Sequence, residues 1–260
     1  MEYRNLVIEE REGIAIIKVS RPKVLNALNT ETLEELRHAA LSVDRREDLL
    51  VVIVTGDGDR AFIAGADIQE MKDKDAYEGM IFSLKGHQAL SAIENMRKPV
   101  IAAVNGYALG GGLEVALACD IIYASDRARL GFPEVTLGIH PGFGGTQRTG
   151  KILGLAKAKE LIFTGRTVSA QEAFEMGLVN KVVAHEKLME EVLGLAAQIK
   201  ANGPIAVSLA KELINRSLFV DINSGLLLEA ESFGICFATK DQKEGMTAFL
   251  EKRRPVFKGA

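Results

Sequence analysis

Short apolar runs alternate with stretches of helical period along the first half of the chain. The run 51–55 is almost wholly apolar, which predicts a strand covered on both faces. Further strands are predicted at 6–8, 14–19, 100–104 and 121–124, the first two joined in a hairpin by the polar turn 9–13. Apolar residues recur every three to four positions at Leu33, Leu36 and Ala40 and again over 77–93, which predicts amphipathic helices.

Beyond Thr149-Gly150 the pattern changes to successive helices. Ser169 to Glu172 predicts a capping box for a helix that ends at Gly177. Further helices are expected over 186–199, 204–215 and 221–237, and one beginning at Asp241. Strands alternating with helices indicate an α/β protein with a helical C-terminal region. The spacing alone does not separate a Rossmann-like sheet from other α/β arrangements.

Composition narrows the class of protein without naming its activity. The chain has 260 residues, 47% of them apolar and 26% charged, which suits one large soluble domain or a domain with a small appendage. A formal net charge of −3 offers no reason to expect nucleic acid binding. No leader-like segment and no apolar run of about 18 residues is present, so we expect a cytoplasmic protein without a membrane partner.

Residues that commonly bind metals are scattered. Cys119 and Cys236 lie in predicted helices among apolar residues, which favours reduced core thiols over a disulfide. Neither has a second cysteine or a histidine at zinc-ligand spacing, so we predict no metal site. Of the four histidines only His140 is a candidate for a functional role, because it follows Glu134 by six residues in a glycine-rich loop.

The stretch 103–148 concentrates the residues with chemical potential. Gly110, Gly111 and Gly112 precede the apolar helix predicted over 113–119, and the first N–H groups of a helix have no partner within it. Such a turn directs free donors, aided by the helix dipole, at an anion. Glu114 is a charge inside this apolar segment, and Glu134 follows Pro133 in a turn beyond the strand 121–124.

Backbone donors beside two carboxylates suit a reaction that passes through an oxyanion with proton transfer. The alternative is structural: the glycines permit tight packing, Glu114 favours a helix N-terminus, and Glu134 is a surface residue. Spacing alone supports both readings about equally. The sequence Gly142 to Gly145 also suggests a phosphate cradle, but it lacks the lysine of a P-loop and the context of a dinucleotide fold.

Five blocks resemble the enoyl-CoA hydratase/isomerase (crotonase) family, and the resemblance spans nearly the whole chain. The blocks are NGYALGGGLEVALACD at 105–120, LGFPEVTLGIHPGFGGTQR at 130–148, AFIAGADI at 61–68, RPKVLNAL at 21–28 and MTAFLEKR at 246–253. The resemblance implies a crotonase-like spiral of ββα turns. Residues 1–160 would form the spiral core with a CoA-thioester site, and 161–260 a helical region that builds homotrimers or homohexamers.

The resemblance also implies roles for individual residues in hydrating a 2-enoyl-CoA to a 3-hydroxyacyl-CoA. The N–H groups of Ala66 and Gly111 would form the oxyanion hole for the thioester oxygen. Glu114 would act as the base toward water and Glu134 as the acid toward C2. No metal or redox cofactor is implied, since coenzyme A is part of the substrate. Its expected contacts, besides Ala66 and Gly111, are Lys23, Ala64, Asp67 and Ile68.

Other members of the superfamily suggest alternatives. An enoyl-CoA isomerase needs only one carboxylate, so the presence of both Glu114 and Glu134 disfavours it. Hydrolases, decarboxylases and dehalogenases of the superfamily usually replace one glutamate or add an aspartate near residue 140, where this chain has histidine. RNA-binding relatives would need a basic surface. The remaining alternative readings are therefore, first, the isomerase and, less favoured, the RNA-binding relative.

Two departures from the common family pattern affect the expected substrate. Phe132 stands where many members have glutamine, and His140 where an apolar or hydroxyl residue is usual. An aromatic neighbour would raise the pKa of Glu134 by desolvation. Residues 71–84 should line the acyl tunnel, and Phe82, if it points inward, would shorten it. We therefore expect substrates of crotonyl size.

Overall fold

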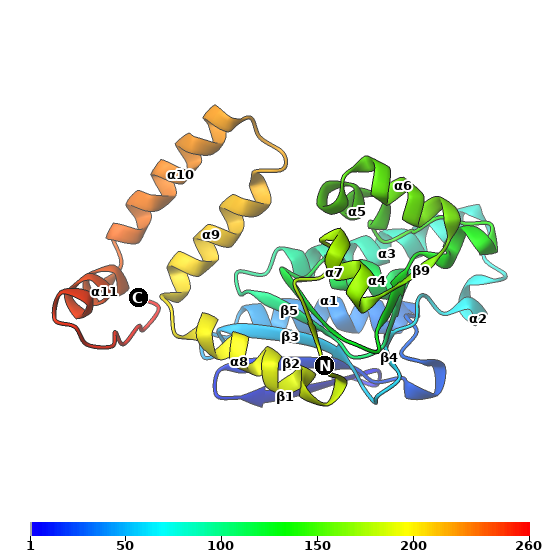
Figure 1. Cartoon of the computed structure of the whole chain (residues 1–260), viewed down its shortest axis with the longest axis horizontal. Helices are drawn as coiled ribbons and strands as arrows, with labels where there is room; N and C mark the ends of the chain where they lie inside the picture. Colours follow the sequence, from blue (N-terminus) through cyan, green and yellow to red (C-terminus); the bar gives the residue numbers. More distant parts are fainter. Residues whose placement is uncertain (1) are drawn as a thin grey trace.

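Two β-sheets form the centre of the protein in a computed structural model that describes residues 2–260 (Figure 1). The larger sheet has the order β1-β2-β3-β5-β7-β10, and all its neighbours are parallel except the β1–β2 hairpin. Its strands are Leu6–Arg11, Ile14–Val19, Val51–Gly56, Val100–Val104, Ile121–Ser125 and Lys181–Val183. The smaller sheet has the order β4-β6-β8-β9, with strands Ala61–Ile63, Tyr107–Leu109, Arg129–Gly131 and Thr167–Ser169.

Successive turns of the chain place one strand in each sheet before a helix follows. β3 and β4 precede α2 and α3, β5 and β6 precede α4, and β7 and β8 precede α5 and α6. These helices span Ile68–Met71, Ala76–Glu94, Gly111–Leu117, Gly145–Leu153 and Leu155–Thr164. The predicted α/β spiral of ββα turns is therefore confirmed. The strands β9 and β10 lie beyond residue 160, on either side of α7 (Ala170–Met176). β9 belongs to the smaller sheet and β10 to the larger one.

The larger sheet is buried on both faces, as the apolar run 51–55 predicts. Val52 and Val54 belong to the main core, which α1 (Thr30–Asp44), α3 and α4 share. Val51 and Ile53 point the other way, into a smaller core completed by α8 (Leu188–Lys200). Alternate residues of one strand thus bury against different helices, because side chains alternate across a strand.

Several local predictions need correction. The helix expected from Asp241 begins at Lys240, and Thr239 caps it while Asp241 binds the backbone of Lys258 and Gly259. Ser169 does accept from the Glu172 N–H, but the Glu172 carboxylate pairs with Arg166 rather than completing a capping box. Both cysteines are free; Cys119 is buried as predicted, whereas Cys236 is only half-buried.

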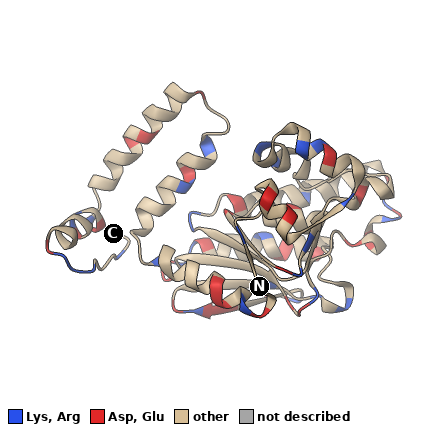
Figure 2. Ribbon diagram, viewed as in Figure 1, with Lys and Arg blue, Asp and Glu red and all other residues tan. Residues whose placement is uncertain are grey.

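The last three helices form an arm that extends away from the sheets (Figure 1). They are α9 (Pro204–Arg216), α10 (Ile222–Phe237) and α11 (Lys240–Leu250). The arm exposes large apolar side chains, and α10 has few charged residues (Figure 2). These side chains include Ile214, Phe219, Ile222, Leu226, Leu227, Phe233, Phe249 and Leu250. Within residues 2–260 no single helix is long and apolar enough to span a membrane. The helical segments 185–200 and 204–216 reach that length and apolar content only when taken together, and the chain bends by 105° between them.

Candidate active site

The loop that follows β4 is hydrogen-bonded through its backbone to the segment before α1. Leu28 donates its N–H to the Gly65 carbonyl at 2.8 Å, and the Asp67 N–H donates back to Leu28 at 2.8 Å. The Ala66 N–H lies between these two bonds, and among residues 2–260 it finds no acceptor. This loop therefore presents one free backbone donor, on the residue to which the resemblance gives a place in the oxyanion hole.

The second donor lies at the start of α4. Gly110 has φ +49°, a conformation that L side chains rarely adopt, and Gly111 is the first helical residue. A Cβ on Gly112 would overlap the Ile63 carbonyl, so the helix packs directly on the end of β4. The Gly111 N–H has no acceptor within the described part of the chain. The three glycines thus serve both readings left open by the sequence, since they allow close packing and leave a donor free.

Glu114 is buried in α4 at 1% exposure. Its Oε1 accepts from the backbone N–H groups of Phe143 at 2.7 Å and Gly145 at 2.6 Å. Burial raises the pKa of Glu114 to about 7, although these two bonds oppose the rise. Both bonds go to Oε1, which leaves Oε2 available for a water molecule.

Glu134 approaches from η2 (Pro133–Leu137), a 3₁₀ helix rather than an irregular loop. A Cβ on Gly110 would lie 2.6 Å from its Oε1, so this carboxylate reaches the Gly-rich turn. Its Oε2 is buried and has no hydrogen-bond partner in residues 2–260. Burial, with a smaller contribution from the charge of Glu114, raises the pKa of Glu134 to about 7. Two carboxyl groups therefore share one site, each able to exchange a proton near neutral pH.

Phe132 packs close to Glu114 and does not neighbour Glu134 alone. A Cβ added to Gly145 would lie 2.8 Å from the Phe132 ring and 3.0 Å from Glu114 Cγ. The ring is fully buried. The aromatic residue therefore contributes to the dry environment of Glu114, a consequence that the sequence position of Phe132 next to Pro133 did not indicate.

One cavity of about 720 Å³ brings most of the predicted residues together. Glu114, Glu134, Ala66 and Gly111 line it, with Ala64 and Ile68. Lys23 and Asp67 do not line it. Lys23 is exposed on η1 (Pro22–Val24), and Asp67 caps α2 and pairs with Arg21 at 3.0 Å.

One side of the cavity comes from α2, α3 and the 137–143 loop. It includes part of the segment 71–84, for which a place in the acyl tunnel stays a prediction. Met71, Met80, Phe82 and Ser83 line the cavity, and so does His140. Phe82 packs edge-on against Phe143, with ring centroids 5.3 Å apart. Lys74, which lies within the segment 71–84, also lines the cavity.

Comparison with known proteins agrees with this geometry. The family model described as enoyl-CoA hydratase/isomerase matches residues 9–260. A short-chain-enoyl-CoA hydratase of Clostridium acetobutylicum is 49% identical over 98% of this chain and 97% of its own length. A crotonyl-CoA hydratase of Syntrophomonas wolfei is 48% identical over 99% of each chain. The crystal structure of an enoyl-CoA hydratase from Bacillus anthracis superposes with a TM-score of 0.96 at 42% identity, covering 99% of this chain and all of that one. This chain therefore belongs to the enoyl-CoA hydratase/isomerase family.

Proposed function

We propose that the protein hydrates short 2-enoyl-CoA thioesters to 3-hydroxyacyl-CoA thioesters. The observation that carries the proposal is the single cavity in which two free backbone N–H groups and two carboxyl groups of raised pKa meet. A conjugated thioester becomes electrophilic at C3 only when negative charge can collect on its carbonyl oxygen. Donors already in place at that oxygen supply this stabilisation without reorganisation.

In the proposed reaction the thioester oxygen accepts from the N–H groups of Ala66 and Gly111. Glu114, ionised, takes a proton from water as the water oxygen bonds to C3. The π electrons move to the thioester oxygen as an enolate, and protonated Glu134 delivers its proton to C2. Each carboxyl group ends in the opposite protonation state, which exchange with solvent restores. No metal or redox cofactor takes part in these steps, and coenzyme A enters only with the substrate.

The direct test is hydration of enoyl-CoA substrates of different lengths, followed through the loss of ultraviolet absorbance of the conjugated thioester. Phe82 and Phe143 line the cavity and pack edge-on against each other, and we place them at the end of the acyl pocket. We therefore expect kcat/KM to be highest for the four-carbon substrate and to fall for eight and twelve carbons. A value that rises toward twelve carbons would contradict the assignment of a short acyl pocket, and no hydration of any length would refute the function.

Assembly into trimers or hexamers is the second part of the proposal. The arm exposes many large apolar side chains close together. Exposed apolar surfaces of this kind commonly mark protein–protein interfaces. Light scattering at micromolar concentration should give a mass at least three times that of one chain. A monomer under these conditions would contradict the assigned oligomerisation role of residues 161–260. We propose the cytoplasm as the location.

A further inference from the structure

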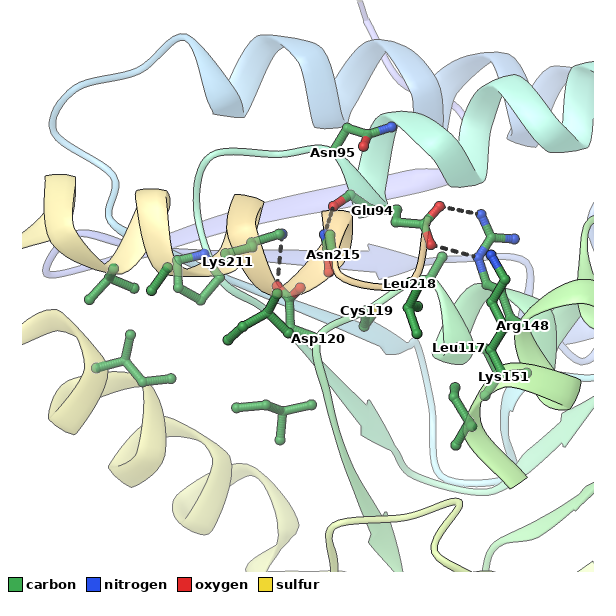
Figure 3. Close-up of a pocket in the computed structure, with 18 of the residues that line it drawn as sticks. Glu94, Asn95, Leu117, Cys119, Asp120, Arg148, Lys151, Lys211, Asn215 and Leu218 are labelled. Carbon is green, nitrogen blue, oxygen red and sulfur yellow. Dashed lines mark hydrogen bonds and ion pairs between the residues drawn. The ribbon is translucent and has the colours of Figure 1, made fainter. Parts of the chain in front are cut away.

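A second cavity of about 720 Å³ lies between α9 and the body of the protein, and neither Glu114 nor Glu134 lines it. Figure 3 shows its charged residues. Lys211 of α9 pairs with Asp120 at 2.8 Å, and Glu94 at the end of α3 pairs with Arg148 of α5. The first pair joins the arm to the body. The second pair lies beside the candidate active site, and its Arg148 contacts the loop 143–145 of that site.

The Glu94–Arg148 pair is bidentate. Arg148 donates from Nε to Glu94 Oε1 at 3.1 Å and from Nη2 to Oε2 at 2.6 Å. The Arg148 side chain is 14% exposed, which makes this pair more shielded than most ion pairs on the surface. Two parallel bonds hold a guanidinium plane in one orientation, which a lysine could not reproduce.

The remaining amino group of Arg148 reaches the loop that binds Glu114. Nη1 donates to the Phe143 carbonyl at 3.1 Å, and a Cβ on Gly144 would overlap this nitrogen. Phe143 and Gly145 are the residues whose N–H groups bind Glu114 Oε1. A continuous set of contacts therefore runs from Glu94 through Arg148 to the two donors that orient the carboxylate.

We infer that Arg148, held by Glu94, is a positioning residue for Glu114: it fixes the 143–145 backbone so that both N–H groups point at the carboxylate. The inference rests on the proposed role of Glu114 as the base in hydration. Arg148 does not line the substrate cavity, so it orients Glu114 through this loop and not through contact with the substrate. The helix α3 supplies further support, since Ser83 Oγ donates to the Gly142 carbonyl at 2.5 Å.

Arg148 also acts on the charge of the base. Its positive charge lowers the pKa of Glu114, against the larger effect of burial. Other charged groups around them include Glu94, which binds Arg148, and Glu134 on η2, whose pKa the charge of Glu114 raises. The cleft also holds Lys151, Asp120 and Lys211, of which the last two form an ion pair. Loss of the guanidinium should therefore raise the pKa of Glu114, so that more of the base is protonated at a given acidic pH.

The test compares Arg148→Gln, Arg148→Lys and Glu94→Gln in the full chain, with crotonyl-CoA hydration measured across pH. We expect Arg148→Gln to lower kcat by about 10²-fold, the size of effect that misplacing a group by about 1 Å produces, with KM changed little. Its acidic limb should move to higher pH. Arg148→Lys should restore the position of that limb but not the full kcat, because it keeps the charge and loses the fork. Glu94→Gln should lower kcat less than Arg148→Gln.

Lys151→Gln is the matched control, because it removes a positive charge from the same helix and the same cleft. Its Nζ lies 3.6 Å from the centroid of the Phe219 ring and does not bind the loop. Its kcat and pH profile should match those of the unchanged protein. In a Glu114→Gln background, Arg148→Gln should cost no further residual activity, since residues that act as a unit are non-additive.

A change in melting temperature alone would indicate a merely structural ion pair. If Arg148→Gln and Glu94→Gln keep kcat and the acidic limb while Glu114→Gln loses hydration, the inference is wrong and the proposed function stands. If Glu114→Gln itself retains hydration, the role of the base is wrong and the positioning role falls with it. Should Arg148→Gln fail to fold, the Lys and Glu94 variants still decide the question.

Discussion

Changing either Glu114 or Glu134 to glutamine should lower kcat for crotonyl-CoA hydration by about 10²- to 10⁴-fold, the range that general acid–base groups supply. The double variant should be little slower than the worse single one, because both carboxyl groups act as a unit in one addition of water across the double bond. Binding of the CoA ester should persist, since its oxygen is held by backbone at Ala66 and Gly111. Steady-state kinetics of the three variants, with the affinity of a saturated acyl-CoA, checks this.

The same variants should not be destabilised at alkaline pH. Burial raises the folded pKa of both carboxyl groups to about 7, above the value of about 4.3 expected for an unfolded glutamate. A carboxyl of raised pKa costs stability once pH exceeds its unfolded pKa, and the cost is complete above its folded pKa. Glutamine removes that cost. For each variant we therefore compare its melting temperature with that of the unchanged protein at the same pH. We expect this difference to be more favourable to the variant at pH 8 than at pH 4.

The kinetic result also separates hydratase from isomerase. An isomerase shuttles one proton with one carboxylate, so only one of the two changes would matter. Near-full hydration by Glu114→Gln, together with loss of double-bond migration by Glu134→Gln, would replace the hydratase assignment. Exchange of the C2 proton with solvent should depend most on Glu134, the proposed acid.

Five of the six strands of the larger sheet could be predicted from the sequence, because β2, β3, β5 and β7 are largely buried and read as apolar runs, and β1 shares a hairpin with β2. The sixth strand, β10, was not predicted, since it has only three residues. The smaller sheet could not be predicted, because β4, β6, β8 and β9 have only three residues each, too short for a period to show. Only the resemblance to the family implied a second strand in each turn. The helix over 77–93 was predicted, yet Tyr77, Met80 and Leu84 are exposed and the buried side includes Phe82 and Gly86.

At the site, the sequence singled out Glu114 and Glu134 as candidates for proton transfer but did not indicate which groups hold them. The segment Gly142 to Gly145 resembled an anion cradle and was set aside because it lacks a phosphate-binding lysine. In the structure it does bind an anion through backbone N–H groups, namely the carboxylate of Glu114. A contact between residues about thirty positions apart has no local signal. For the same reason the role of Arg148, the last residue of the quoted block, was not visible in the sequence.

The second large effect is expected from Gly112→Ala. A methyl group there would overlap the Ile63 carbonyl and lie 2.7 Å from its carbon, and this neighbour is backbone that cannot rotate away. Ile63 ends β4 and leads into the loop of Ala66, so moving α4 away from β4 also separates the Gly111 and Ala66 N–H groups. Misplacing one oxyanion donor costs about 10²- to 10³-fold in rate.

We therefore expect Gly112→Ala to lower kcat by at least that factor and to lower the melting temperature, since overpacking costs about 1–3 kcal/mol. Gly194→Ala in α8 is the control: nothing lies within 4 Å of the added methyl, and a glycine replaced at a compatible helical position gains stability. Kinetics below the melting temperature of each variant separates the two effects. A folded Gly112→Ala protein with unchanged kcat would mean that hydration does not depend on the spacing of these two N–H groups, and the oxyanion hole would have to be sought elsewhere in the cavity.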